Sequence, residues 1–238
     1  MKIICSKSSL LKSVSIALKA VPSKTTMPIL ECILMDATTN QIKFTTNDME
    51  LGIETIVEGT IEEKGKVALD AKIFYEIIRR LPDNDVTIKT DDKYAATITC
   101  EKAKFNIPGK SGEDFAYLPM IEKDEPLTIS QYTLKEMIRQ TIFSIAVNEN
   151  NKLMTGELFE IKNNCLKVVS LDGHRISIRK MSLKKDYSDR KVVVPGKTLS
   201  EVSKILSGEV DDQVSIYFTK NHILFCLLYT SPSPRDCS

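Results

Sequence analysis

The sequence predicts an α+β fold made of two copies of one unit. Four elements recur in the same order (helix, strands, helix, strands) with a period near 124 residues, and a fixed period is typical of repeated domains. Each copy contains amphipathic helices, whose apolar side must lie on a sheet. The segments between the helices alternate between apolar and polar residues, as half-buried strands do. Together these observations predict a pseudo-symmetric molecule.

Each copy opens with a helix followed by paired strands. "SSLLKSVSIALKAV" (8–21) and "QYTLKEMIRQTIFSI" (131–145) both have helical spacing, with Lys12 aligned to Lys135. "QIKFTTNDMELGIETI" (41–56) and "CLKVVSLDGHRISIRK" (165–180) both alternate as strands do, and an aspartate-containing turn interrupts each of them. The first half of the unit is therefore predicted twice.

A short strand and a second helix come next in both copies. "VALDAKIFYEIIRRL" (67–81) aligns with "VVVPGKTLSEVSKIL" (192–206). The predicted apolar faces consist of Phe74, Ile77 and Leu81 in the first copy and of Leu199, Val202 and Leu206 in the second. The opposite faces match at a spacing of 125 residues, and they carry Lys72, Glu76 and Arg79 in the first copy and Lys197, Glu201 and Lys204 in the second.

A hairpin closes each copy. "DVTIKTDDKYAATITC" (85–100) and "QVSIYFTKNHILFCL" (213–227) each read as two strands around a polar turn. Between the copies, "GEDFAYLPMIEKDEP" (112–126) contains the charges and structure-breaking residues of a linker.

Composition excludes several classes of protein. The net charge of +1 argues against a strongly basic nucleic-acid binder, although a basic face balanced by acidic residues elsewhere stays possible. No signal peptide or membrane span is present, so we expect a cytoplasmic protein that does not bind membranes. Scattered cysteines fit free thiols in a reducing compartment rather than disulfides or a metal site; they are Cys5, Cys32, Cys100, Cys165, Cys226 and Cys237.

Two short motifs resemble nucleotide-binding loops but lack an essential residue. "PGKS" (108–111) and "PGKT" (195–198) would need a glycine five positions before the Gly-Lys pair, to let the backbone wrap a phosphate. Lys104 and Lys191 occupy those positions. We therefore expect no nucleotide and no other cofactor or metal.

The segment "SLDGHRISI" (170–178) brings Asp172 and His174 close together. An acid–base pair of this kind could serve a hydrolase, given a nucleophile or metal nearby. The first copy has "NDME" (47–50) in the same turn, and this favours an aspartate that bonds local amides. A strand-connecting turn is the preferred interpretation, and a hydrolase is the alternative.

At this point the residues resemble those of a known family, the bacterial sliding clamps, which are the beta subunits of DNA polymerase III. The resemblance runs in order from Met1 to about Leu227. It rests on "MPIL" (27–30), "NDMELGI" (47–53), "AKIFYEIIRRLP" (71–82), "GELFEI" (156–161), "LDGHRISI" (171–178) and "VVVPGK" (192–197).

The resemblance implies tandem DNA-clamp domains, with helices on the inner face of a ring and antiparallel sheets outside. We expect clamp domain I at residues 1–121 and clamp domain II, incomplete at its C-terminal end, at residues 122–228. Residues 229–238 read as an unrelated or disordered tail. Family members carry a third domain, so the chain is expected to be a fragment that lacks it.

The family also implies a non-catalytic processivity factor of the replicative polymerase, which encircles double-stranded DNA without reading its sequence. In the complete protein two subunits form a homodimer ring; this fragment is expected to be a monomer. The resemblance puts DNA contacts at Lys24, Lys72, Asn148 and Lys152. The polar helix faces add Lys12, Lys19, Arg79, Lys135, Arg139, Lys197 and Lys204.

In the family, the loop that corresponds to "LDGHRI" forms one wall of a hydrophobic pocket for short peptides. These peptides belong to partners such as the DNA polymerase III catalytic subunit and the clamp loader. The matching residues here are Met154, Leu171, Gly173, His174, Arg175 and Ile176. A peptide-docking module without a DNA function is a second alternative.

Overall fold

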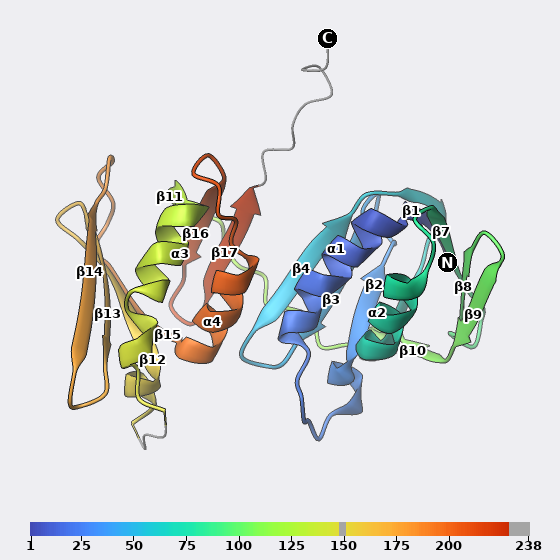
Figure 1. The fold of residues 1–238 in the computed structure, drawn as a ribbon, viewed down its shortest axis with the longest axis horizontal. Coiled ribbons are helices and arrows are strands. Elements are labelled where there is room, and N and C mark those ends of the chain that lie inside the picture. Colours follow the sequence, from blue (N-terminus) through green and yellow to red (C-terminus); the bar gives the residue numbers. More distant parts are fainter. Residues whose placement is uncertain (148–150, 229–238) are drawn as a thin grey trace, which may run out of the picture. The chain divides into compact units, whose positions relative to one another are not determined.

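The computed structural model describes residues 1–147 and 151–228, which form two compact units divided between Pro119 and Met120. Each unit consists of helices packed on antiparallel sheets (Figure 1). The α+β class predicted from the sequence is therefore confirmed. No helix within the described ranges is long and apolar enough to cross a membrane.

The first unit has two five-stranded sheets, ordered β5-β1-β7-β8-β9 and β10-β6-β2-β3-β4. The helices α1 (Lys7–Ala17) and α2 (Ala71–Arg80) contact each other. Their N-termini are capped by Ser6 and Asp70, whose side chains accept from the third amide beyond. The strands are β1 (Lys2–Ser6), β2 (Cys32–Asp36), β3 (Ile42–Asn47), β4 (Gly52–Val57), β5 (Thr60–Glu63), β6 (Lys66–Asp70), β7 (Asp85–Thr90), β8 (Ala96–Cys100), β9 (Ala103–Ile107) and β10 (Gly109–Ser111).

The second unit has a three-stranded sheet, ordered β11-β16-β17, and a four-stranded sheet, ordered β14-β13-β12-β15. Its helices are α3 (Gln131–Arg139) and α4 (Gly196–Ile205), which contact each other as α1 and α2 do. The strands are β11 (Leu127–Ser130), β12 (Gly156–Lys162), β13 (Cys165–Leu171), β14 (Ile176–Ser182), β15 (Arg190–Pro195), β16 (Gln213–Phe218) and β17 (Ile223–Leu228). After a first strand that was not predicted (β1 and β11), both units follow the predicted order of helix, strands, helix, strands, so the repeat is confirmed.

The core of the first unit differs from the prediction at one position of α2. Phe74 and Ile78 are fully buried, and the ring of Phe74 meets that of Phe44 edge to face, with centroids 6.1 Å apart. Ile77, which we predicted in the apolar face, is only partly buried at the edge of this core. The buried face therefore runs through Ala71, Phe74 and Ile78, a spacing of three and then four residues.

The predicted linker at residues 112–126 is wrong in its first part. β10 adds a strand to the sheet beside β6, and a 3-10 turn (Gly112–Asp114) follows it. Phe115 is then buried against Cys32, Leu34 and Ala68. Residues as far as Phe115 are thus part of the first unit's packing, because a large aromatic side chain gains more from burial than a linker position would give it.

Candidate functional site

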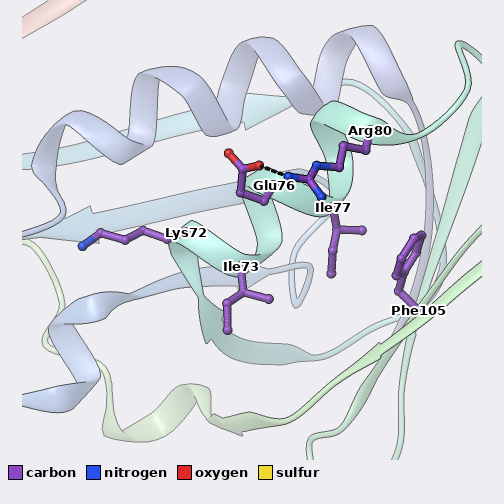
Figure 2. A pocket seen from close by; sticks show the side chains of 6 residues that line it. All are labelled: Lys72, Ile73, Glu76, Ile77, Arg80 and Phe105. Carbon is purple, nitrogen blue, oxygen red and sulfur yellow. Dashed lines mark hydrogen bonds and ion pairs between the residues drawn. The ribbon is translucent and has the colours of Figure 1, made fainter.

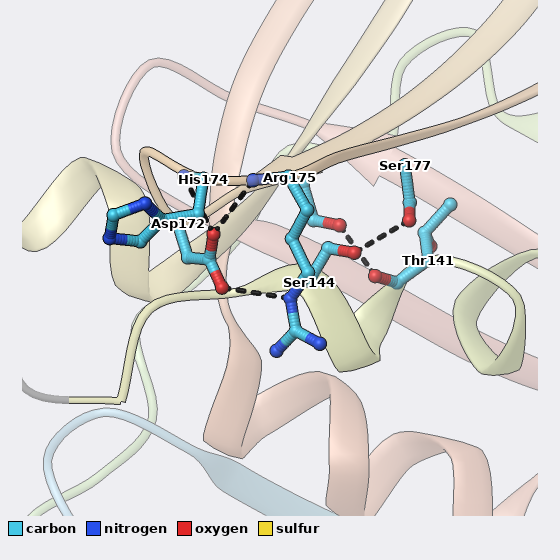
Figure 3. Close-up of polar contacts among 7 residues, drawn as sticks. Thr141, Ser144, Asp172, His174, Arg175 and Ser177 are labelled. Atoms are coloured by element: carbon cyan, nitrogen blue, oxygen red, sulfur yellow. Dashed lines mark hydrogen bonds and ion pairs between the residues drawn. The ribbon is translucent and has the colours of Figure 1, made fainter.

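The loop between β13 and β14 is organised by one carboxylate. Oδ1 of Asp172 accepts hydrogen bonds from the backbone amides of His174 and Arg175, each 3.0 Å long. Oδ2 accepts from Nε of Arg175 at 2.8 Å (Figure 3). The amide of His174, followed by the amide and guanidinium of Arg175, holds the pKa of Asp172 below its ordinary value. Gly173 supplies the positive φ of +86° that the turn needs.

The first unit contains the same loop between β3 and β4. Oδ1 of Asp48 accepts from the amides of Glu50 and Leu51 at 3.0 and 2.8 Å. Met49 takes the positive φ of +74° where the second unit has Gly173. A turn made twice by the same contacts is a feature of the fold, so the interpretation of Asp172 as a turn former is confirmed. Both of its oxygens are already occupied by the loop, which does not favour the hydrolase.

All six predicted peptide-wall residues lie on or beside this loop. Leu171 and Ile176 lie opposite each other in the β13–β14 ladder, and they are 38% and 60% exposed. Met154 comes from a separate 3-10 turn (Lys152–Thr155), and its Cε lies 3.9 Å from where a Cβ on Gly173 would stand. His174 and Arg175 are exposed at the tip of the loop. The result is a patch of apolar side chains with a basic rim.

Sequence reasoning missed the residues that support this patch from below. The guanidinium of Arg175 lies over the ring of Phe143, 5.8 Å from its centroid, a favourable cation–π distance. Ser144 and Ser177 share a hydrogen bond of 2.6 Å between their hydroxyls (Figure 3). The amide of Ala146 donates to the carbonyl of Met154 at 2.9 Å. The segment from Thr141 to Ala146 therefore joins both parts of the wall.

The basic residues predicted in the first unit lie mostly on exposed surface. Lys12, Lys24, Lys72 and Arg79 are exposed, and Lys19 is half-buried. Arg79 pairs with Glu76 at 2.7 Å, one turn earlier on α2. An exposed pair of this kind is weak, so the arginine can exchange its partner for another anion.

The basic residues of the second unit are less uniform. Lys152, Lys197 and Lys204 are exposed, as is Arg139. Lys135 is half-buried, and its ammonium donates to the backbone carbonyl of Leu206, at the end of α4, at 3.0 Å. Ion pairs one turn apart join Arg139 to Glu136 and Lys204 to Glu201. Asn148 lies outside the described residues.

A surface hollow of about 320 Å³ lies between α2 and Phe105 of β9 in the first unit. Its apolar floor comes from Ile73, Ile77 and Phe105, and its charged edge from Lys72, Glu76 and Arg80 (Figure 2). Ile73 is 50% exposed and Phe105 40%, an unusual exposure for side chains of this size. This hollow was not predicted from the sequence, although Ile73 interrupts the polar face of the helix.

The part of the chain that the structure describes holds no cluster of three metal-binding side chains. The cysteines at positions 5, 32, 100, 165 and 226 are free thiols. Burial raises the pKa of Cys5 to about 12, which keeps this thiol protonated and unreactive.

Comparison with known proteins gives consistent matches over nearly the whole chain. Residues 1–119 match the model of the DNA polymerase III beta subunit N-terminal domain, and residues 128–229 match that of its central domain. The beta sliding clamp of Staphylococcus epidermidis is 33% identical over 216 residues, which cover 87% of this chain and 57% of that protein. The chain thus spans little more than half the length of this relative.

Solved structures agree with these matches. A crystal structure of a Eubacterium rectale protein assigned as a DNA polymerase III beta subunit is 66% identical, with a TM-score of 0.94 over 96% of this chain and 62% of that one. The DNA polymerase sliding clamp from Bacillus subtilis is 33% identical, with a TM-score of 0.91 over 98% of this chain and 66% of that one.

Proposed function

Because this chain belongs to the family of DNA polymerase III beta subunits, we propose that it works as a sliding clamp. In this role it is a non-catalytic processivity factor that follows double-stranded DNA in the cytoplasm without reading its sequence. The observation that carries the proposal is the repeated basic face of the second helix of each unit. Lys72 and Arg79 on α2 recur as Lys197 and Lys204 on α4, and all four side chains are exposed.

The chemistry of these faces suits weak contact with phosphates. Lysine and arginine on a helix surface attract the DNA backbone regardless of base sequence. Glu76 and Glu201 pair with Arg79 and Lys204 on the same helices, and such acids reduce the net attraction. A clamp that slides needs contacts of this kind, because strong fixed contacts would hold it at one site.

We propose further that the patch around Met154, Leu171 and Ile176 docks short linear peptides of the polymerase catalytic subunit and the clamp loader. Leucine and phenylalanine anchors fit its apolar surface, and Arg175 at the rim can meet a peptide carboxylate. A docking role also fits a loop whose only acidic group, Asp172, is fully used in shaping the turn.

We also propose that the hollow on α2 belongs to the subunit interface of a homodimer ring in the complete protein. In a homodimeric clamp the first domain of one subunit meets another domain of its partner. The exposed isoleucine and phenylalanine side chains of this hollow are apolar surface that such an interface would bury.

A salt series tests the DNA part of the proposal. Binding of the chain to two fluorescent duplexes of unrelated sequence is measured by anisotropy between about 50 and 200 mM salt, where phosphate contacts weaken steeply. We expect equal affinities for the two duplexes at each salt concentration and a linear fall on logarithmic axes. A chain that binds a Leu/Phe peptide but neither duplex at 50 mM salt would be a docking module without a DNA function.

A further inference from the structure

Glu157 is a carboxyl group buried inside the second unit, and neither the turn nor the basic faces account for it. It lies on β12 in phase with Phe159 and Ile161, so it faces the core with them. Its exposed fraction is 0%, and its Oε2 has no hydrogen-bond partner among the described residues. An ionised carboxylate in such a place is costly, whereas a protonated one is tolerated.

The contacts of Thr141 indicate which form is present. Its Oγ1 lies 2.8 Å from the carbonyl oxygen of Met137 and 2.7 Å from Oε1 of Glu157. The threonine hydroxyl has one proton, and a carbonyl oxygen has none to give. Both short contacts are hydrogen bonds only when Glu157 carries a proton: the acid then donates to Oγ1, and Oγ1 donates to Met137. An ionised Glu157 would instead accept the hydrogen bond of the threonine hydroxyl, and the Met137 carbonyl would then face a lone pair of Oγ1.

Thr141 connects this proton to the proposed peptide wall. It begins the segment that carries Phe143 beneath Arg175 and Ser144 beside Ser177. Its backbone carbonyl also accepts from the hydroxyl of Ser170, on the strand that leads into the loop. The segment is therefore bonded to Glu157 on its inner side and to the wall on its outer side.

We propose that Glu157 is a positioning residue of the peptide wall and that the proton it shares with Thr141 holds the Thr141–Ser144 segment in place. This inference rests on the proposed docking function of the wall. When Glu157 loses the proton, its charge draws the hydroxyl of Thr141 away from Met137. The contacts of Phe143 with Arg175 and of Ser144 with Ser177 then loosen, so docking weakens as pH rises.

Within residues 1–147 and 151–228, no charged group is a cause of the raised pKa of Glu157 or opposes it. Burial raises the pKa of Glu157 to about 7. Half-buried Lys135 on α3 donates to the backbone carbonyl of Leu206. The other charged side chains on the surrounding elements are in ion pairs or exposed at the surface. They are Glu136 with Arg139 on α3, Glu160 with Lys167 across β12 and β13, Arg190 and exposed Lys191 on β15, and Lys197 and Glu201 with Lys204 on α4.

The test compares the pH dependence of docking in three proteins. A fluorescent peptide with leucine and phenylalanine anchors is titrated into the parent chain, Glu157→Gln and Glu160→Gln between pH 5.5 and 8.5. Glutamine at 157 keeps a donor for Thr141 and cannot ionise, whereas Glu160 lies on the outer face of the same strand and serves as the control. His174 is present in all three proteins, so any effect of this side chain on docking is common to them.

We expect the Kd of the parent to rise roughly tenfold between pH 6 and 8, since only the protonated fraction docks well. Glu160→Gln should follow the parent, and Glu157→Gln should lose this rise. Equal pH profiles for the parent and Glu157→Gln would overturn the proposal.

A second readout does not depend on peptide binding. In the free chain, the ¹³C shift of the Glu157 carboxyl and the amide shifts of residues 143–146 and 174–177 are followed by NMR over the same pH range. We expect the carboxyl shift and the amide shifts to change with the same pH midpoint. In Glu157→Gln, the amide shifts should no longer change with pH in this way. If the amides ignore the carboxyl titration, the proposal is wrong. If the amide shifts follow the carboxyl titration but the peptide binds at no pH, the proposed docking function is wrong instead.

Discussion

Asp48 and Asp172 occupy the same position in two copies of one loop. Each carboxylate accepts hydrogen bonds from the backbone amides of the second and third residues beyond it, at distances of 2.8 to 3.0 Å. In the second copy, Oδ2 of Asp172 also accepts a hydrogen bond from the guanidinium of Arg175. The shared part builds the turn, and the added part orients Arg175 at the rim of the peptide wall.

This pair of loops predicts a selective loss of docking. Asp172→Ala removes the acceptor for two amides and for Arg175, so the wall loses its shape and peptide affinity should fall several-fold. Asp48→Ala removes the equivalent amide acceptor in residues 1–119 and should leave peptide affinity unchanged. Titration of one labelled peptide into both variants, with melting curves to confirm folding, measures this. Equal losses in the two variants would mean that the loss reflects general stability and not the wall.

A second prediction concerns the stability of the second unit as a function of pH. The raised pKa of Glu157 means that the folded chain keeps a proton between about pH 4.5 and 7 that the unfolded chain releases. The stabilisation is therefore complete below about pH 4.5 and is lost as pH rises to about 7. Linkage gives a slope approaching 1.4 kcal/mol per pH unit and a total of about 3 kcal/mol.

Urea unfolding at several pH values checks this slope. Glu157→Gln should flatten the profile in that range relative to the parent, because the amide does not ionise. Glu160→Gln, on the opposite face of the strand, where Glu160 pairs with Lys167, should keep the parent's slope. A parent whose stability is constant from pH 5 to 7 would show that Glu157 is ionised in the folded chain.

A third prediction separates the core of α2 from the hollow beside it. Phe74→Ala removes a fully buried ring and should cost about 3–5 kcal/mol of unfolding free energy. Ile73→Ala, one residue earlier and half exposed, should cost less than about 1 kcal/mol. Chemical denaturation of both variants makes the comparison. A large loss for Ile73→Ala would show that this isoleucine belongs to the core and is not surface available to a partner.

The sequence predicts well whatever depends on local chemistry. The Asp172 turn could be predicted because an aspartate carboxylate reaches amides only two or three residues away. The repeat could be predicted because helical and strand periods repeat within each copy. Ile77 and Ile78 were harder to separate, since adjacent isoleucines fit the apolar stripe almost equally until the packing around Phe74 decides between them.

Contacts between segments that are far apart in the sequence could not be predicted. Nothing local marks Phe143 as the partner of Arg175, or Lys135 as a donor to the end of α4. Phe115 lies in a stretch rich in charges and breakers, and its burial depends on Cys32, Leu34 and Ala68, which come much earlier in the sequence. Glu157 did carry a signal, because alternation puts it on the same face as Phe159 and Ile161. An acid at the start of a strand is nevertheless usually read as exposed.

The central claim is that the repeated basic helix faces hold DNA by its phosphates, and one comparison of double variants tests it most directly. Lys72→Glu with Lys197→Glu reverses one exposed charge on the second helix of each unit. Lys102→Glu with Lys180→Glu makes the same change of net charge at exposed positions away from the helices. Binding of both variants and the parent to a random duplex is measured by anisotropy from about 50 to 200 mM salt.

We expect the helix variant to lose at least about tenfold in affinity at 50 mM salt and its logarithmic salt slope to fall by about 1 to 2, as the loss of two phosphate contacts requires. The control variant should stay near the parent in both measures. Equal affinities of the helix variant and the parent at 50 mM salt, or equal losses in the two variants, would contradict the assignment of these faces to DNA.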